Sequence, residues 1–257
     1  MVRTCLFLFL FSFSIFPYSF TGDFSAGIYW GSFPIATVIS DSDSQILDQL
    51  ETLTAQAVAQ WEDAVGKEVW SLSSTSSGGL SGGNSIRWSN NFAQETGYNP
   101  STTLAVTIRY RTGTFFTRYE IILNGENTAL RMNSNNMLFQ TILHELGHVI
   151  GLDHSSDTSA VMYASLQGIN NLSHDDHSGA NAAIDENIYR QSVGFVSELA
   201  SSENSTSRSP LACGTIGMID SGPGDGPQSG LISLVFGLLI ALTFSFARKN
   251  LPPLSFI

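Results

Sequence analysis

The chain has 257 residues, which is enough for one domain with a sizeable core after two apolar ends are set aside. Its formal net charge is -11, and residues 23–199 contain 7 Lys and Arg against 19 Asp and Glu. This acidity argues against a nucleic-acid partner, because such affinity comes mostly from cations on phosphate, and against adsorption to an anionic membrane surface. It is consistent with an exported protein that charge keeps soluble.

The first 22 residues are typical of a secretory signal peptide. Arg3 gives a positive start, an apolar run extends from Leu6 to Phe16, and a polar exit begins at Pro17. We expect cleavage within residues 18–24. The alternatives are an uncleaved anchor or a buried helix, but the apolar run is short for a membrane span.

Residues 34–39 predict a short strand, and residues 44–65 predict a helix. Apolar side chains fall three or four positions apart along that helix and form one stripe: Ile46, Leu50, Leu53, Ala57, Trp61 and Val65. Asp41 or Asp43 is expected to cap its start. Residues 69–73 and 85–89 are candidate strands, separated by a loop rich in Gly and Ser.

The segment 104–111 alternates between two sets of residues. Large apolar or aromatic residues occupy every second position and are separated by smaller or charged ones: Leu104, Val106, Ile108 and Tyr110 against Ala105, Thr107, Arg109 and Arg111. This period of two predicts a half-exposed strand. Residues 119–123 predict another strand, joined to it through residues 112–114, and a helix follows from about Asn135 to Ile150. The order of elements predicts an α/β fold with a mixed sheet.

The candidate catalytic motif is HELGHVIGLDH at residues 144–154. His144 and His148 are four positions apart, so a helix places both imidazoles on one face, one turn apart. Gly151 permits a positive backbone φ, so the helix can end there and bring His154 to the same ion. Three histidines with one open coordination position are typical of catalytic zinc.

This arrangement predicts hydrolysis of a peptide bond. Zinc lowers the pKa of its bound water toward ~7 and polarises the scissile carbonyl. Glu145, next to the first ligand, would accept the proton of the water and pass it to the leaving amine. The five fixed positions of HExxHxxGxxH match by chance in roughly 10⁻⁴ of chains of this length, so a helix without metal is a weak alternative.

The motif resembles that of the metzincin zinc endopeptidases, and the eight residues from His154 to Met162 resemble the spacing in matrixins. Met162 matches the methionine turn that lies below the zinc in this clan, although Ala164 stands where a proline is usual. Residues 57–65, with Trp61 and Glu62, resemble the first helix of a matrixin. Residues 172–184 resemble the start of its third helix, where Ser173 and Asp176 also form a capping-box pattern.

The resemblance implies a metzincin-like mixed sheet with an antiparallel edge strand, an active-site helix and a C-terminal helix. It also implies that strand 104–111 is an exposed edge that pairs with an extended peptide, which makes Ala105, Val106 and Thr107 candidate substrate contacts. Tyr163, after the methionine turn, is a further candidate contact. The loop from Tyr163 to Asn171 would wall the main specificity pocket.

The chain departs from the matrixin pattern in three ways. No cysteine-switch propeptide precedes the domain, and Cys5 and Cys213 lie in the terminal segments, so the domain has no internal disulfide. The loop that binds structural zinc in matrixins contains no histidine, which leaves one catalytic Zn²⁺ as the expected metal. The calcium loops are not recognisable, so Ca²⁺ is unsupported. His174 and His177 are expected to be solvated residues at a helix start.

The C-terminal part predicts a membrane attachment. Residues 200–229 have the composition of a flexible linker or sorting region. Residues 230–247 form an uncharged, mostly apolar run that can span a bilayer, and the cations that follow predict a cytoplasmic tail at residues 248–257. The three parts together resemble a bacterial surface-protein sorting signal, and a plain membrane tether is equally compatible.

These features together predict an exported, monomeric zinc endopeptidase at the cell envelope, held by its C-terminal helix or released after processing. Its catalytic domain would span residues 23–199, and its partner would be a polypeptide substrate. Two alternatives remain: a catalytically silent binding module on the same fold, and a hydrolase of cell-wall peptide.

Overall fold

The computed structural model describes residues 17–76, 82–132, 135–201 and 211–217. The expected signal-peptide core, the span at 230–247 and the tail at 248–257 lie outside these residues, as does most of the expected linker. Among the described residues, no helix is both long and apolar enough to cross a bilayer.

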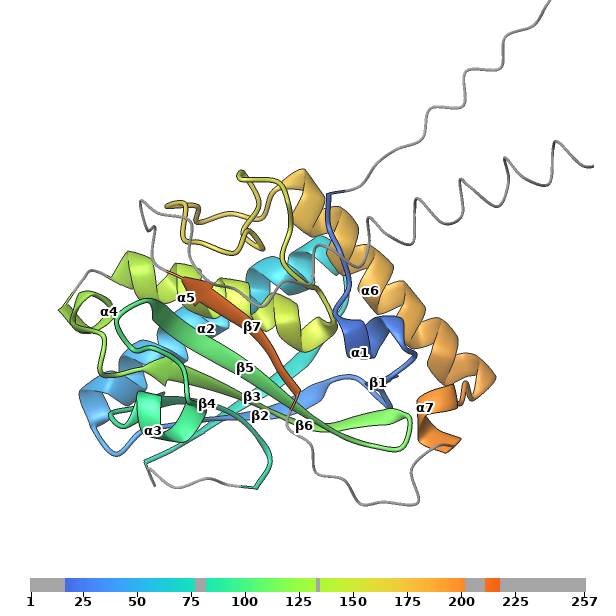
Figure 1. Cartoon of the computed structure of the whole chain (residues 1–257), viewed down its shortest axis with the longest axis horizontal. Coiled ribbons are helices and arrows are strands. Elements are labelled where there is room, and N and C mark those ends of the chain that lie inside the picture. The colour runs from blue at the N-terminus through green and yellow to red at the C-terminus, as the bar shows by residue number, and fades with distance from the viewer. Residues whose placement is uncertain (1–16, 77–81, 133–134, 202–210, 218–257) are drawn as a thin grey trace, which may run out of the picture. The chain divides into compact units, whose positions relative to one another are not determined.

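The described residues form an α/β fold with a mixed sheet. Its strands are β1 (Tyr29–Trp30), β2 (Ile35–Ser40), β3 (Trp70–Thr75), β4 (Asn84–Ser89), β5 (Thr103–Thr112), β6 (Phe115–Asn124) and β7 (Leu211–Gly217). The strand order is β3-β2-β4-β6-β5-β7, with β1 paired to one end of β6 (Figure 1). Strands β2, β3, β4 and β6 run parallel, whereas β5 is antiparallel to both β6 and β7.

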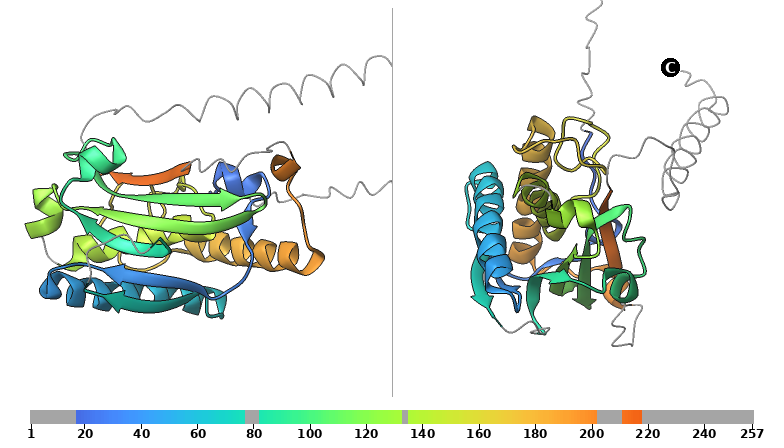
Figure 2. Two further views of the ribbon diagram at one scale, coloured as in Figure 1. Left: turned by 90° about the horizontal axis from the view of Figure 1, so that it is seen from below. Right: turned by 90° about the vertical axis from the view of Figure 1, so that its left-hand side faces the viewer.

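Three long helices pack together against the sheet (Figure 2). They are α2 (Ser44–Val65), α5 (Asn135–Ile150) and α6 (His174–Val193). The shorter helices are α1 (Gly22–Ser25), α3 (Phe92–Thr96), α4 (Thr128–Met132) and α7 (Glu198–Ser201). Two indole groups hold α5 in the core, because Trp61 Nε1 donates to the carbonyl of Leu143 and Trp30 Nε1 donates to that of Val149, each over 2.8 Å.

The predicted helix starts are confirmed in detail. The carboxylate of Asp43 accepts hydrogen bonds from the amides of Gln45 and Ile46 at the start of α2. Ser173 and Asp176 form a capping box at the start of α6. His174 and His177 are exposed in the first turn of that helix.

The prediction that strand 104–111 is half-exposed is wrong. Most side chains of β5 are buried on both faces, including Ala105, Thr107 and Arg109 at 0% exposure. The prediction that this strand is a sheet edge is also wrong, because β6 pairs with one of its sides and β7 with the other. Residues 211–217, expected to be linker, form that outer strand instead.

The folded domain begins before residue 23. The backbone amide of Tyr18 donates to the carboxylate of Asp175 over 2.9 Å, and the amide of Thr21 donates to the carbonyl of Gly151 over 2.9 Å. Phe24 is fully buried in the core. Residues 18–22 are therefore part of the packed structure, whereas the expected domain started after them.

Candidate metal centre and active site

Helix α5 and the turn after it bring three histidines together, as the spacing predicts. Potential ligand atoms of His144, His148 and His154 all lie within 4.8 Å of one another. The Nε2 atoms of His144 and His148 are 3.0 Å apart. Both of these side chains are fully buried, and they come from successive turns of one face of the helix.

Each helical histidine is oriented by a backbone carbonyl. Nδ1 of His144 lies 2.7 Å from the oxygen of Val161, and Nδ1 of His148 lies 2.7 Å from the oxygen of Leu152. Because a carbonyl can only accept, each Nδ1 must carry the hydrogen, and each Nε2 then presents a lone pair. This is the usual way in which outer contacts fix metal-binding imidazoles.

The third histidine completes a donor set that fits zinc. Nε2 of His154 is buried and has no hydrogen-bond partner among the described residues. A buried polar atom without a partner is costly, and a metal ion would satisfy it. Three neutral imidazoles are a ligand set of catalytic zinc sites, with a fourth position open.

Burial keeps the histidines neutral. Burial, followed by the nearby His154, lowers the pKa of His144 from 6.5 to about 3. Burial and then His144 lower the pKa of His148 well below its usual value. The pKa of His154 is also lowered by burial, against an opposing effect of Asp153. All three are thus ready to bind a metal ion at neutral pH.

Two glycines in the motif are required by close contacts. Gly151 has φ 109°, which other residues rarely adopt, and a Cβ there would lie 2.7 Å from the ring of Phe24. A Cβ on Gly147 would lie 3.0 Å from Trp61 and would also collide with Met162. Met162 is buried, and its sulfur lies close to Gly147 of the active-site helix.

Asp176 holds that methionine turn in place. Its carboxylate accepts hydrogen bonds from the amides of Val161 (2.8 Å), Met162 (3.0 Å) and Ser173 (2.8 Å). The sequence identified Asp176 through its capping pattern alone and gave no sign of its contact with the turn. Because Val161 in turn accepts from His144, Asp176 acts on the metal centre through the backbone.

Glu145 and Thr107 form a direct contact that the sequence did not predict. The hydroxyl of Thr107 lies 2.6 Å from Oε2 of Glu145, and both side chains are fully buried. The hydroxyl donates, since a carboxylate only accepts. Thr107, expected to contact substrate, therefore orients the candidate base with its side chain. Ala105 and Val106 are buried, and Tyr163 is half-buried with its amide bonded to the carbonyl of Ala160.

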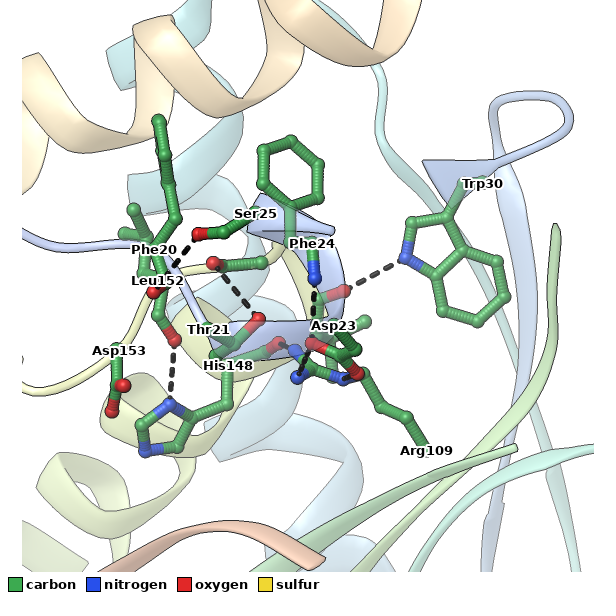
Figure 3. Close-up of polar contacts among 12 residues, drawn as sticks. Phe20, Thr21, Asp23, Phe24, Ser25, Trp30, Arg109, His148, Leu152 and Asp153 are labelled. Atoms are coloured by element: carbon green, nitrogen blue, oxygen red, sulfur yellow. Dashed lines mark hydrogen bonds and ion pairs between the residues drawn. The ribbon is translucent and has the colours of Figure 1, made fainter. Parts of the chain in front are cut away.

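A buried ion pair joins the N-terminal segment to the active-site helix (Figure 3). Nη2 of Arg109 lies 2.6 Å from Oδ1 of Asp23, and the same guanidinium donates to the carbonyl of His148. The guanidinium also lies 5.0 Å from the centre of the Phe116 ring. The alternation in the sequence predicted an exposed Arg109, but the side chain is fully buried. Nothing near Arg109 in the sequence indicates that Asp23, far away along the chain, would pair with its charge.

The loop after Met162 lines a small cavity against α5. The cavity has a volume of about 10 Å³, and its lining includes Gln140, Val161, Leu166 and Ile169. A space of this size holds about one water molecule. The expected loop thus borders a cavity, but one too small to admit a substrate side chain.

A comparison with protein families agrees with this geometry. A family model described as Matrixin matches residues 40–184, which is more than half of the chain and includes the three histidines, Glu145 and Met162. The match, together with a buried three-histidine cluster suited to zinc, shows that the chain belongs to the matrixin family of zinc metallopeptidases.

Proposed function

We propose that the protein is a zinc-dependent endopeptidase that hydrolyses peptide bonds in extracellular or envelope proteins, with Glu145 as general base. The observation that carries this proposal is the position of the Glu145 carboxylate, which lies next to the first histidine and is oriented by Thr107. A catalytically inactive binding module would not need a buried carboxylate held next to the metal ligands by a hydrogen bond.

The roles of the residues follow from their contacts. His144, His148 and His154 would hold one Zn²⁺ through their Nε2 atoms. When bound, zinc supplies an activated water and polarises the substrate carbonyl. Glu145 accepts a proton from the attacking water and delivers it to the nitrogen of the leaving amine. Thr107 holds the carboxylate, so little reorganisation is needed as the proton moves.

We also propose that the protein is exported and held at the cell envelope. The proposal is supported by the apolar run after Arg3 and by the uncharged run at residues 230–247, followed by Arg248 and Lys249. Fractionation of cells that express the full chain would test it. Recovery of the protein only in the cytoplasm would contradict export.

The test of activity uses the full chain from Pro17, loaded with zinc and kept in detergent. It is incubated with a complex peptide library, and cleavage sites are read by mass spectrometry beside the variant Glu145→Gln. We expect cleavage by the wild type and a loss of about 10²–10⁴-fold in the variant, because general-base catalysis is removed. Zinc content should be equal in the two proteins, since Glu145 is not a ligand.

The outcomes separate the alternatives. Cleavage that is lost with the variant and with a chelator would establish the endopeptidase and reveal its side-chain preference. A folded, zinc-loaded protein that cleaves peptidoglycan peptides but no library peptide would favour the cell-wall hydrolase. If it cleaves neither, and still cleaves no peptide when the pairing of β7 with β5 is disrupted, the endopeptidase proposal is wrong and a binding role is favoured.

A further inference from the structure

Strand β5 passes directly beside the candidate catalytic centre. Its residue Thr107 contacts Glu145, and its residue Arg109 contacts the carbonyl of His148. An extended polypeptide that reaches this centre by pairing with the sheet must use the side of β5 that faces away from β6. Main-chain pairing of this kind is a common mode of peptide recognition.

That side of β5 is already occupied by the chain's own strand β7 (Figure 1). Val106 is opposite Thr215, and Ile108 is opposite Ala212, in antiparallel register. The register shifts between these pairs, so residues 213 and 214 both lie opposite Thr107. Strand β7 also contacts the active-site helix α5. It therefore crosses the site at the position of the candidate base.

Substrate and β7 cannot pair with β5 at the same time. Neighbouring strands lie about 4.8 Å apart, which leaves room for one partner on each side of a strand. Because β7 belongs to the same chain and follows α7 after residues 202–210, it competes at a local concentration on the order of millimolar. A dilute polypeptide would be at a disadvantage against it.

The composition of β7 suits a strand that can be displaced. Its sequence is LACGTIG, with Gly214 inside the strand and Gly217 at its end. Glycine weakens strand pairing, since it loses much conformational entropy and offers no side chain to pack. Thr215 and Ile216 are β-branched and favour the extended backbone. The pairing of β7 with β5 therefore has a defined register, but its glycines limit the free energy that it contributes.

We propose that β7 is an autoinhibitory strand that occupies the peptide-binding side of β5, so that polypeptide substrates reach the active site only when β7 is displaced. The proposal rests on the proposed endopeptidase function and extends it to the regulation of the same site. It assigns a function to a part of the expected linker, residues 211–217, that neither the catalytic motif nor the matrixin match includes.

The test compares the full chain from Pro17 with the double variant Thr215→Pro/Ile216→Pro. Proline removes the backbone N–H at two adjacent positions, of which one faces β5 in an antiparallel pair. The matched control is Ser205→Pro/Thr206→Pro, which introduces two adjacent prolines outside β7. Intact mass, zinc content and melting temperature are measured for each protein to verify that it is folded and uncleaved.

Two readouts are expected to change in the strand variant and not in the control. The kcat/KM for library peptides should rise about tenfold or more, mainly through a lower KM, which corresponds to the removal of ~1.4 kcal/mol of competing pairing. Hydrogen exchange at those amides of residues 105–108 that face β7, measured in the Glu145→Ala background, should become faster because β5 loses a partner, whereas the amides that face β6 should be unchanged.

A peptide added in trans provides a second, independent measurement. A synthetic peptide of residues 208–219 with Cys213→Ser, so that no thiol can bind zinc, should inhibit the strand variant competitively, with KM raised and kcat unchanged. A peptide of the same composition in shuffled order should not inhibit.

The failures of the two proposals are distinguishable. If the wild type and the strand variant cleave with equal kcat/KM and their β5 amides exchange equally, the autoinhibitory role is overturned and the endopeptidase stands. If neither protein cleaves any peptide, the proposed function fails, and the autoinhibitory role fails with it whatever the exchange data show.

Discussion

The metal centre depends on a few side chains that orient the ligands and the base. His144 and His148 are fixed by backbone carbonyls, and Glu145 is fixed by the hydroxyl of Thr107. Thr107 and Val161 are far in sequence from the groups that they orient, whereas Leu152 follows His148 by one helical turn. The two carbonyls belong to the backbone and remain when side chains change, so Thr107 is the partner whose contact a substitution can remove.

Thr107→Val tests the orientation of the base. Valine keeps the shape and the strand preference of threonine but cannot donate a hydrogen bond. We expect kcat to fall about 10- to 100-fold, as for other groups that orient catalytic or metal-binding residues, with KM and zinc content nearly unchanged. Thr107→Ser retains the hydroxyl and should retain most of the activity. Equal kcat for the valine variant and the wild type would show that the contact has no catalytic role.

The buried histidines make the metal-free protein sensitive to acid. The unfolded chain protonates His144 near pH 6.5, whereas the folded chain resists protonation until about pH 3. Between these values the unfolded state binds more protons, so the free energy of unfolding should fall as pH is lowered below 6.5 and should level off above it.

Urea unfolding of the chelator-treated chain at pH 5 and pH 7.5 measures this effect. His144→Gln should reduce the difference in unfolding free energy between the two pH values. His174→Gln, a change at an exposed histidine outside the site, is the matched control and should leave the difference as it is in the wild type. An identical difference in all three proteins would contradict the prediction.

At the scale of elements, the start of α6 is joined to the loop that supports the zinc site. The carboxylate of Asp176 closes the capping box and also binds the amides of Val161 and Met162. One buried side chain therefore stabilises a helix end and a turn together. Because Val161 accepts the hydrogen bond from His144, a disturbed turn should also weaken the metal site.

Asp176→Ala should lower the free energy of unfolding by about 2–4 kcal/mol, since it removes three buried hydrogen bonds to a charged group. It should also weaken zinc binding. The matched control Ser173→Ala removes the cap without touching the turn and should cost about 1 kcal/mol, with zinc affinity retained. Chemical denaturation and competition with a zinc chelator measure the two quantities. Equal zinc affinity in Asp176→Ala and the wild type would contradict the coupling.

At the scale of the described molecule, the N-terminal segment connects parts of the structure on several sides of the active-site helix. Residues 18–24 contact α6 through Asp175 and the turn after α5 through Gly151. Asp23 neutralises Arg109, which is itself buried against His148 (Figure 3). The segment therefore links strand β5, the zinc-binding helix and the C-terminal helix.

A chain that starts at Asp23 should be less stable than one that starts at Pro17. It loses the hydrogen bonds of Tyr18 and Thr21 and the packing of Phe20, which together contribute about 2–5 kcal/mol. Thermal and urea unfolding of the two zinc-loaded chains would measure the difference. Ser101→Ala in the longer chain, a change at an exposed serine outside the segment, is the control. Equal stability of the two chains would mean that the segment adds little to the fold.

Much of the site was predictable because it depends on local geometry. The four-residue spacing of His144 and His148, the glycine at position 151 and the capping pattern at Ser173 each act within one helix or one turn. Such patterns have the same consequence wherever the helix packs. The bounds of α2 and α5 also agree with the apolar periodicity.

The incorrect predictions all concern contacts between distant parts of the chain. The alternation in strand 104–111 indicated one exposed face, but α5 packs against β5 on one side and Phe92 and Tyr98 pack with Val106 and Ile108 on the other. Arg109 is buried because Asp23, far away in sequence, neutralises it. Residues 211–217 have the composition of a linker, and only pairing with β5 makes them a strand.

The sequence alone determined the zinc-binding motif, the helices that carry it and the identity of the candidate base, since those features follow from spacing along the backbone. The tertiary structure decided which side chains orient Glu145, how the N-terminal segment contacts the site and that β7 pairs with the side of β5 that faces away from β6. These depend on the burial of charge and on strand pairing between residues far apart, whose energies exist only once the sheet and helices have packed together.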